Sequence, residues 1–386
     1  MGLPLTWAEI DLRAIAHNVR ALRQITDSKA RLMAVVKANA YGHGVMEVTK
    51  TALKHGAELL GVARIHEGIQ LREAGFDAPV LILGYTPSCY AESMVHFDLT
   101  PTISSYLQAK ALSDAVCGIG KKIRIHLKVD TGMGRLGILP DSRRYIPTGK
   151  KSTTSALEEV AAIASLPGVE LEGVYTHFAT ADSADKSYAI KQFEIFLDFL
   201  EKLRQIGIEP AVRHTANSAA IIDMPETHLD LVRAGISLYG LYPSGEVNKS
   251  RIELKPAMAL KTRIAHLKKV PSGFKISYGI TYETKTPTTV ATVPIGYADG
   301  LNRLLSSRGK MLVYGLRAPI IGRVCMDQTM LDVGHIPDVQ LDQEVVVFGE
   351  QGNDCISIEE MASELNTINY EIVCSITNRV PRVYLR

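Results

Sequence analysis

Short apolar runs alternate with amphipathic helical stretches along the chain up to about Tyr239. The apolar runs lie at residues 32–36, 59–63, 80–83, 100–103, 123–129, 171–178, 212–216 and 231–238. Eight strand-helix repeats over roughly 230 residues are typical of a (β/α)8 barrel. A doubly wound open sheet shows the same alternation, but no glycine-rich dinucleotide fingerprint follows the first run. We therefore predict a closed barrel of the TIM type.

The pattern changes after Pro243 to closely spaced β-type runs separated by glycine and proline. Examples are residues 288–294, 310–314, 328–333 and 344–348. Such spacing predicts an all-β barrel or sandwich. The expected fold class is therefore α/β plus all-β. A (β/α)8 barrel domain at residues 1–243 precedes a predominantly β domain at residues 244–386.

Local signals predict four further segments. Asp11 can cap a helix whose apolar positions recur every three to four residues. The capping-box pattern Ser357-x-x-Glu360 opens a helix within the β region. Residues 142–155 are polar, basic and broken by proline and glycine, which indicates an exposed loop before a helix at residues 156–164.

Composition and charge narrow the function classes. Hydrophobic residues make up 46% of the chain, enough for a sizeable core, and 43 basic against 41 acidic residues leave a formal charge of +2. That balance gives no electrostatic footprint for nucleic acid. No apolar run approaches the length of about 18 residues that a membrane helix needs, and the first residues lack the pattern of a secretory signal. Five widely spaced cysteines indicate free thiols in the reducing cytoplasm rather than disulfides or a metal site.

Lys37 is the residue whose position points most directly to chemistry. It ends the apolar run LMAVVK and is followed at once by ANAYGHG. The carboxyl ends of buried strands are where α/β barrels gather their catalytic groups, and a partly desolvated amine there can act as a nucleophile. A lysine that merely snorkels from the strand end is the alternative. Gly42 and Gly44, which allow close backbone approach to a ligand, and the hydroxyl of Tyr41 favour the chemical interpretation.

The segment AVVKANAYGHG closely resembles the pyridoxal-phosphate lysine segment of bacterial alanine racemases of fold-type III. The resemblance continues in chain order through DTGMGRLG, YTHFATAD, ANSAA, VRAGISLYG, SYGITY, PIGYADG, GRVCMDQ and INYE. These blocks span nearly the whole chain. The resemblance implies an isomerase that interconverts L- and D-alanine and supplies D-alanine for peptidoglycan. It further implies pyridoxal 5'-phosphate bound as an aldimine on Lys37, with two-base transfer of the α-proton.

By the same resemblance, Tyr278 is the second catalytic base and reaches the active site of the partner subunit. Two acid/base groups on opposite faces are the economical way to remove a proton from one face and return one to the other. If Tyr278 comes from the partner, each active site is composite, and a symmetric homodimer is implied. His177 and His214 could support such a relay, although a histidine on a barrel strand is often a satisfied core residue.

The resemblance also supplies a cradle for the cofactor. In barrels of this type, phosphate usually lies at the loops after strands seven and eight. The residues implied to bind the cofactor, besides Lys37, are Tyr41, Arg135, His177, Asn217, Ser218, Arg233, Gly235, Ile236 and Tyr370. Arg233 is placed at the pyridine nitrogen. An arginine cannot accept a hydrogen bond there and leaves that nitrogen unprotonated, which weakens the electron sink and favours prompt reprotonation.

Further roles are implied around the substrate. Arg135 would face the substrate carboxylate and the cofactor's phenolic oxygen. The partner subunit would supply Met326 and Asp327 to the carboxylate region, with the backbone amide of Met326 as the direct donor. Lys128 corresponds to a lysine that is often carbamylated in the family, although an ordinary ion-paired lysine is the alternative. Tyr297 and Tyr370 resemble the aromatic pair at the family's substrate entrance, where they would leave room for little more than a methyl side chain. Such a pocket discriminates by only about 1–3 kcal/mol per methylene. No metal is expected.

Three other functional hypotheses compete with alanine racemisation. Diamine decarboxylases combine a similar barrel and β domain, but their cysteine-aspartate proton donor only loosely matches Cys325 and Asp327. Arg233 and Tyr278 argue against that class. A non-catalytic cofactor carrier is typically a barrel alone. A broad-specificity racemase is a nearer alternative, although an exported enzyme would need a signal sequence.

Overall fold

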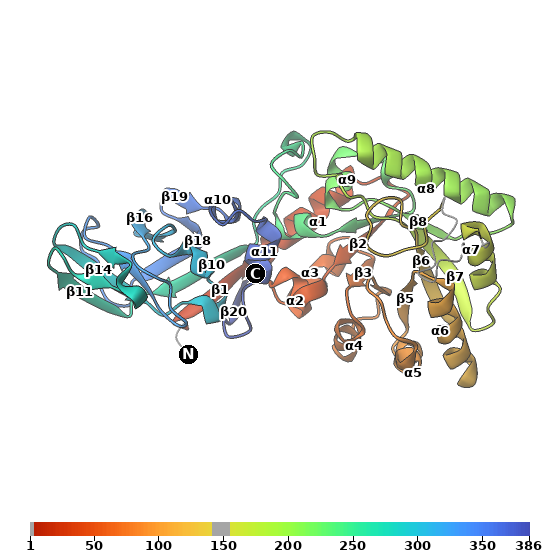
Figure 1. Ribbon diagram of the computed structural model, residues 1–386, viewed down its shortest axis with the longest axis horizontal. Coiled ribbons are helices and arrows are strands. Elements are labelled where there is room, and N and C mark those ends of the chain that lie inside the picture. Colours follow the sequence, from red (N-terminus) through yellow and green to blue (C-terminus); the bar gives the residue numbers. More distant parts are fainter. Residues whose placement is uncertain (1–3, 141–154) are drawn as a thin grey trace. The chain divides into compact units, whose positions relative to one another are not determined.

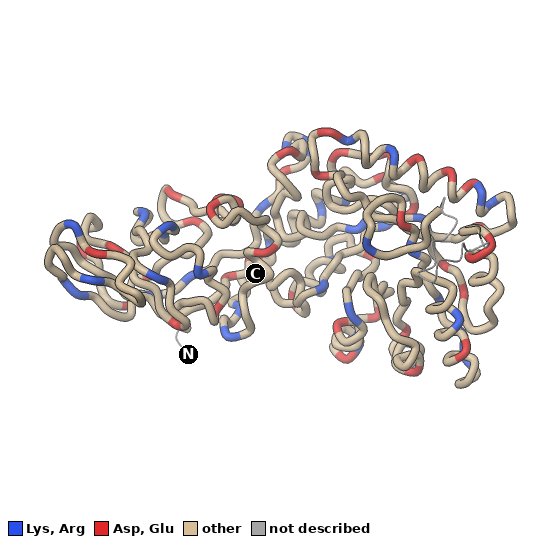
Figure 2. The backbone as a smooth tube through the Cα atoms, viewed as in Figure 1, with Lys and Arg blue, Asp and Glu red and all other residues tan. Residues whose placement is uncertain are grey.

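The computed structural model describes residues 4–140 and 155–386, which form two compact units. The larger unit comprises residues 15–40 and 45–255, and the smaller unit comprises residues 4–14, 41–44 and 256–386. In the described part of the chain, no helix has both the length and the apolar character required to cross a membrane. Acidic and basic residues are interspersed along the tube, for example on α8 (Ser187–Gln205), as the near-zero net charge leads one to expect (Figure 2).

The larger unit is built on one sheet of eight parallel strands in the order β8-β7-β6-β5-β4-β3-β2-β9 (Figure 1). The strands are β2 (Arg31–Val35), β3 (Leu59–Val62), β4 (Val80–Ile82), β5 (Leu99–Ile103), β6 (Ile123–Lys128), β7 (Val169–Tyr175), β8 (Val212–His214) and β9 (Leu231–Ala234). The first and last strands of this order approach each other, because the Arg233 amide donates to the Ala216 carbonyl at 3.0 Å and the Asp230 amide to the Arg213 carbonyl at 3.1 Å. The sheet is thus a nearly closed barrel, which confirms the predicted fold class.

Helices follow the strands and cover the outside of the barrel (Figure 1). They are α1 (Leu12–Ile25), α2 (Lys37–Tyr41), α3 (Val45–Lys54), α4 (Ile65–Glu73), α5 (Ala91–His96), α6 (Tyr106–Gly118), α7 (Ala156–Ala164), α8, α9 (Ser218–Asp223) and the short 3-10 turns η1 (Ser88–Tyr90), η2 (Pro225–Thr227), η3 (Ile236–Tyr239) and η4 (Lys249–Arg251). Asp11 caps α1 by accepting the amides of Arg13 at 2.8 Å and Ala14 at 3.3 Å, as predicted. The predicted helix at residues 156–164 is α7, whereas the predicted loop before it lies, except for Ser155, outside the described residues.

The smaller unit is mostly β, as predicted for the C-terminal part of the chain. Its main sheet has the order β16-β15-β18-β10-β1-β20, with β19 added to β18; β11, β14 and β17 form a second sheet, and β12 and β13 a hairpin. The strands are β1 (Thr6–Asp11), β10 (Met258–Arg263), β11 (His266–Val270), β12 (Lys275–Ile276), β13 (Tyr282–Glu283), β14 (Thr288–Val293), β15 (Lys310–Val313), β16 (Leu316–Pro319), β17 (Thr329–Asp332), β18 (Glu344–Gln351), β19 (Asp354–Ile356) and β20 (Arg382–Leu385). Helices α10 (Ile358–Glu364) and α11 (Asn369–Cys374) and the 3-10 turns η5 (Tyr278–Ile280), η6 (Tyr297–Asp299) and η7 (Arg303–Leu305) complete it. The predicted cap of α10 is present, since Ser357 Oγ accepts the Glu360 amide at 2.9 Å.

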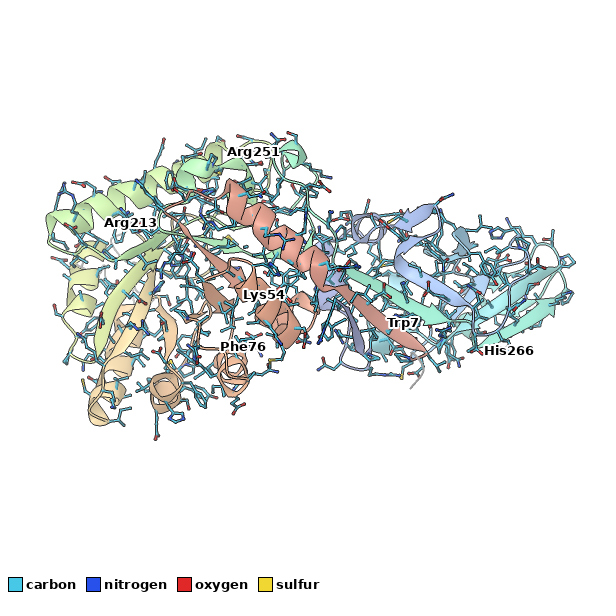
Figure 3. All side chains as sticks on the ribbon, turned by 180° about the vertical axis from the view of Figure 1, so that it is seen from behind. Trp7, Lys54, Phe76, Arg213, Arg251 and His266 are labelled. Carbon is cyan, nitrogen blue, oxygen red and sulfur yellow. The ribbon has the colours of Figure 1, made fainter. Side chains whose placement is uncertain are left out.

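Two features differ from the sequence pattern. The last predicted barrel run extended to residue 238, but β9 ends at Ala234 because Gly235, with φ −101° and ψ −110°, turns the chain into η3. The N-terminal strand β1 was not predicted, and it lies in the smaller unit between antiparallel β10 and parallel β20. Its buried Trp7 (Figure 3) lies under the Arg263 guanidinium, 5.4 Å from the ring centroid.

Candidate active site

Lys37 lies just beyond the carboxyl end of β2, and the backbone that follows it has an unusual conformation. Ala38, Asn39, Ala40 and Tyr41 have φ between 51° and 54°, so α2 is a left-handed turn made without glycine. Left-handed helical geometry costs roughly 1–2 kcal/mol per L-residue, and such strain is characteristic of functional sites. The turn leaves Lys37 partly exposed at the end of a buried strand.

Glu67 on α4 holds the start of this turn. Its Oε1 accepts the Ala38 amide at 2.6 Å. Its Oε2 accepts the amides of Ala63 at 2.7 Å and Arg64 at 2.9 Å, which caps its own helix. Glu67 was not predicted from the sequence, because the residue three positions earlier is an arginine and does not complete a capping-box pattern.

The end of the turn is held by local contacts. Asn39 Oδ1 accepts the Val45 amide at 2.8 Å, which caps α3, and the Ala40 amide donates to the Val36 carbonyl at 2.9 Å. Together with Glu67, these bonds offset the strain of four consecutive left-handed residues.

Arg233 lies on β9, which pairs directly with β2, and its guanidinium is buried. Nη1 lies 2.9 Å from His214 Nδ1, and Nη2 donates to the carbonyls of Thr176 and Thr215 at 2.9 Å each. Nη2 also lies 3.3 Å from His177 Nδ1. Burial lowers the pKa of Arg233 to about 10, so the group remains protonated at neutral pH.

The two histidines beside this guanidinium are neutral. Burial, followed by the charge of Arg233, lowers the pKa of His177 and of His214 well below the usual value. Since a guanidinium only donates, His214 Nδ1 accepts from Nη1, and the His214 ring proton is on Nε2. Nη2 has two N–H groups and three neighbouring acceptors, of which His177 Nδ1 is the most distant. The site therefore contains one fixed positive charge surrounded by neutral acceptors.

Asn217 and Ser218 begin α9 at the end of β8. Asn217 Oδ1 caps the helix by accepting the Ala220 amide at 3.1 Å. Ser218 Oγ accepts the Gly235 amide at 2.8 Å and lies 3.4 Å from the Ser237 amide. The turns after β8 and β9 are thus joined through one hydroxyl, and the Gly235–Ile236 segment opens η3 beside it.

Lys128 at the end of β6 is only 4% exposed. Its Nζ has no hydrogen-bond partner among the described residues and lies 4.8 Å above the Tyr175 ring. Burial, followed by the charges of Arg233 and Arg135, lowers the pKa of Lys128 well below its ordinary value. A lowered pKa makes the neutral, nucleophilic form of the amine more accessible.

Arg135 projects from the loop that follows β6, and its side chain is exposed. Asp130 Oδ1 shapes the loop by accepting the amides of Gly132 at 3.0 Å and Gly134 at 3.1 Å. The Tyr188 hydroxyl on α8 donates to the Gly132 carbonyl at 2.9 Å. The loop is therefore held at both its start and its apex.

The other residues predicted for the site belong to the smaller unit. Tyr41 is buried, and its ring centroid lies 6.1 Å from that of Tyr370 on α11. Tyr278 is 71% exposed and follows Ser277, which has φ 64° and donates through Oγ to the Arg323 carbonyl at 2.7 Å. Tyr278 is thus presented on a shaped turn without being covered by its own chain.

Tyr297, Met326 and Asp327 lie together on the same unit. The Tyr297 amide donates to the Cys325 carbonyl at 3.1 Å, and the Ala298 amide donates to the Met326 carbonyl at 3.0 Å. Asp327 forms an ion pair with Arg379 at 2.8 Å. The side chains of Tyr297 and Met326 remain 43% and 52% exposed.

The comparisons with known proteins match the chain from end to end. The alanine racemase N-terminal domain matches residues 10–243 and the alanine racemase C-terminal domain matches residues 257–384. The chain is 56% identical to alanine racemase from Desulfosudis oleivorans, covering 98% of this chain and 96% of the relative. It is 50% identical to alanine racemase from Methanococcus maripaludis, covering 98% of each.

Solved structures give the same result. Alanine racemase from Clostridium difficile 630 superposes with a TM-score of 0.92 at 40% identity, covering 100% of this chain and 97% of that one. Alanine racemase from Bacillus anthracis with bound L-Ala-P also has a TM-score of 0.92 at 40% identity, covering 100% and 96%. The chain therefore belongs to the alanine racemase family, the pyridoxal-phosphate-dependent isomerases that interconvert L- and D-alanine.

Proposed function

We propose that this chain racemises alanine with Lys37 and Tyr278 as two opposed acid/base groups, and that residues 1–243 bind the cofactor while residues 244–386 supply the second base. The observation that carries the proposal is the pairing of β2 with β9, which brings the turn after Lys37 and the buried Arg233 to neighbouring strands of one barrel. Ligands of such barrels bind at the carboxyl ends of the strands.

The residues present fit pyridoxal phosphate. Arg233 Nη1 donates to His214, and Nη2 donates to Thr176 and Thr215. The Nε–H and the second Nη1–H are left, and we propose that the Nε–H faces the pyridine nitrogen. His177, held at Arg233 Nη2, would lie beside the ring. Lys37 Nζ would hold the cofactor's aldehyde carbon covalently.

The phosphate would be held where the turns after β8 and β9 meet. Ser218 Oγ, the Ile236 amide, and the hydroxyls of Tyr41 and Tyr370 would contact it, with Asn217 and the Gly235 backbone shaping the turn. The bond from the Gly235 amide to Ser218 Oγ, which joins the turns after β8 and β9, supports this assignment.

When bound, pyridoxal phosphate withdraws electrons from the substrate α-carbon and makes its proton removable. Lys37 Nζ would take or return that proton on one face, and the Tyr278 hydroxyl would do so on the other. The buried, neutral histidines keep Arg233 as a donor that does not protonate the ring nitrogen.

The substrate carboxylate would be bound by Arg135 and by the backbone amide of Met326 of the partner subunit, with the partner's Asp327 beside it. The Met326 carbonyl accepts from Ala298, whereas the Met326 amide has no acceptor among the residues that the structure describes. Tyr297 and Tyr370 would narrow the entrance, so that a methyl side chain is the best fit.

Lys128 would carry a carbamate. Its neutral Nζ would attack the carbon of CO2, forming an N–C bond and releasing one proton, and the resulting anion would face Arg135. The low pKa and the absence of a hydrogen-bond partner for Nζ among the described residues support this modification.

The working unit would be a homodimer with composite sites, since Tyr278 is 71% exposed on its own chain. The five free cysteines support a reducing cytoplasmic setting. The D-alanine produced would supply peptidoglycan.

The test uses purified protein loaded with pyridoxal phosphate and incubated with L-alanine in deuterated water. We expect D-alanine carrying α-deuterium, followed by chiral chromatography and NMR. The variant Tyr278→Phe should lose racemisation by at least about a hundredfold, the usual contribution of a general acid/base group, while Lys37 still exchanges the α-proton of one antipode.

Unchanged L-alanine without α-exchange in the loaded wild-type protein would overturn the proposed function. Exchange of both antipodes by Tyr278→Phe at the wild-type rate would instead remove Tyr278 from the mechanism and leave a one-base reaction.

A further inference from the structure

A line of four side chains crosses the interior of the barrel from the candidate site toward the opposite rim. Arg233 Nη1 lies 2.9 Å from His214 Nδ1, His214 Nε2 lies 2.9 Å from His126 Nδ1, and His126 Nε2 lies 3.3 Å from Glu172 Oε2. The residues come from β9, β8, β6 and β7, of which β6, β7 and β8 are consecutive in the sheet (Figure 1). Both histidines are almost fully buried, whereas the Glu172 side chain is 27% exposed.

The two ends of this line determine the direction of every hydrogen bond in it. A guanidinium can only donate, so His214 Nδ1 must accept and its proton is on Nε2. That Nε2–H donates to His126 Nδ1, which places the His126 proton on Nε2 in turn. A carboxylate can only accept, so Glu172 receives the last hydrogen bond. Both histidines are therefore neutral Nε2–H tautomers.

Packing keeps the line in place. The Tyr175 ring stacks on His214 with centroids 4.5 Å apart and an interplanar angle of 9°. The Tyr175 hydroxyl pairs with Thr102 Oγ1 at 2.8 Å. Gly173 leaves room for His126, because a Cβ on this residue would lie 2.6 Å from the imidazole Cε1. The rings cannot move aside without disturbing the barrel wall.

Reversing the direction of these bonds would break the contact with Arg233. If His126 carried its proton on Nδ1, His214 would have to accept at Nε2 and carry its own proton on Nδ1. That proton would face a guanidinium N–H. An acceptor at the Glu172 position excludes this arrangement.

We propose that Glu172 is a positioning residue for Arg233, acting through His126 and His214. The inference rests on the proposed function, because its consequence depends on Arg233 facing the cofactor. With Nη1 held by His214 and Nη2 held by two backbone carbonyls, Arg233 keeps its Nε–H aimed into the site. The low pKa values of His214 and of Glu172, the latter lowered chiefly by its bond to His126, agree with this arrangement.

Two substitutions separate hydrogen bonding from charge. Glu172→Leu removes the acceptor at similar size. Glu172→Gln removes the charge but can still accept through its amide oxygen. A matched control is Asp98→Asn. It weakens the ion pair of Arg124 with Asp98 at 2.8 Å, and Arg124 also contacts Glu172 Oε1 at 3.4 Å, but it keeps the Glu172 carboxylate as the acceptor for His126.

The first readout is nitrogen NMR of the holoenzyme labelled with 15N in its histidine rings, with signals assigned by His126→Gln and His214→Gln. In the wild type, we expect both residues as Nε2–H tautomers. Glu172→Leu should mix or reverse them, whereas Glu172→Gln and Asp98→Asn should not. Wild-type rings in the Nδ1–H or doubly protonated form would overturn the inference without any variant.

The second readout is the dissociation constant and absorption spectrum of bound pyridoxal phosphate. For Glu172→Leu, we expect roughly tenfold weaker binding, as for the loss of one hydrogen bond to a charged group, and near-normal binding for Glu172→Gln. Unchanged tautomers in Glu172→Leu overturn the inference. Altered tautomers with unchanged cofactor binding and spectrum instead contradict the placement of Arg233, and thus the proposed function on which the inference rests.

Discussion

At the scale of single residues, Glu67 links two backbone segments that are distant in sequence. One carboxylate oxygen completes the N-terminus of α4, and the other receives the first amide of the left-handed turn after Lys37. Carboxylate acceptors for backbone amides are stronger than neutral ones. Glu67 therefore sets the geometry from which Lys37 projects, without being placed in contact with a substrate.

We predict that Glu67→Gln selectively impairs the Lys37 site. A glutamine has one acceptor oxygen, and its NH2 group would face one of the amides that Glu67 now accepts. We expect slower formation of the Lys37–cofactor bond and roughly a tenfold loss of activity, the effect of misplacing a reacting group slightly. The measurement is the rate of the absorbance change after adding pyridoxal phosphate to apoprotein.

Glu158→Gln is the matched control for Glu67→Gln. Glu158 caps α7 by accepting the Ser155 amide at 2.6 Å, and it has no assigned role in the site. It should lower stability by about 1 kcal/mol without slowing cofactor binding. Equal effects of the two variants on cofactor binding would show that Glu67 is merely a helix cap.

At the scale of elements, the left-handed turn makes a prediction about stability. Ala38 is exposed at φ 52°, where glycine is not strained. Ala38→Gly should stabilise the protein by up to about 1 kcal/mol, because relief of the strain exceeds the extra entropy of the unfolded chain. Urea unfolding gives the free energy.

The comparison for Ala38→Gly is Ala111→Gly, at an exposed position in the middle of α6. This second variant should lose about 1 kcal/mol, the normal cost of glycine in a helix. Similar losses in both variants would mean that the turn after Lys37 is not left-handed in solution.

The buried His228, directly after η2, bonds to the loop between α1 and β2. This contact predicts that the free energy of unfolding depends on pH. His228 Nδ1 accepts the Asp27 amide at 3.0 Å and Nε2 donates to the Ile221 carbonyl at 3.2 Å. Burial lowers the pKa of His228 in the folded state. Below the unfolded value of about 6.5, the unfolded chain takes up a proton that the folded chain does not.

The free energy of unfolding should therefore fall as the pH drops from about 6.5, by up to about 1.4 kcal/mol per pH unit for each such histidine. His228→Gln should reduce this slope by up to about 1.4 kcal/mol per pH unit below about pH 6.5, and leave it unchanged between pH 7 and 8. Urea unfolding across this range is the measurement. An unaltered slope in the acid range would mean that His228 titrates equally in both states.

At the scale of the whole molecule, the exposed Tyr278 predicts complementation between inactive subunits. In a mixed dimer of Lys37→Ala and Tyr278→Phe chains, one site has both intact residues and the other has neither. After subunit exchange at equal concentrations, half of the dimers are mixed. Activity should then recover to about a quarter of the wild-type value, as measured by D-alanine formation.

Each variant incubated alone through the same exchange procedure is the control. Failure to recover activity although mass spectrometry shows mixed dimers would place Lys37 and Tyr278 of one active site on the same chain.

The amino-acid sequence by itself determined the features that depend on neighbouring residues. The eight apolar runs predict the barrel strands, since strands buried on both faces need continuous apolar residues. Asp11 and Ser357 predict helix starts, because a cap bonds within its own first turn. The position of Lys37 at the end of a buried strand is likewise predicted without a structure. The family resemblance predicts the other site residues.

Only the tertiary structure decided the features that join distant segments. The left-handed turn after Lys37 contains no glycine that would predict it from the sequence. Glu67, which binds the first amide of this turn, is 29 residues away in the sequence. His126 meets His214 and Glu172 across separations of 88 and 46 residues, because the sheet places β6, β7 and β8 side by side. Strand β1 pairs with β10 and β20 of the smaller unit, which are likewise distant in the sequence. Hydrophobic periodicity and caps are local signals, whereas these contacts depend on how the strands are ordered in space.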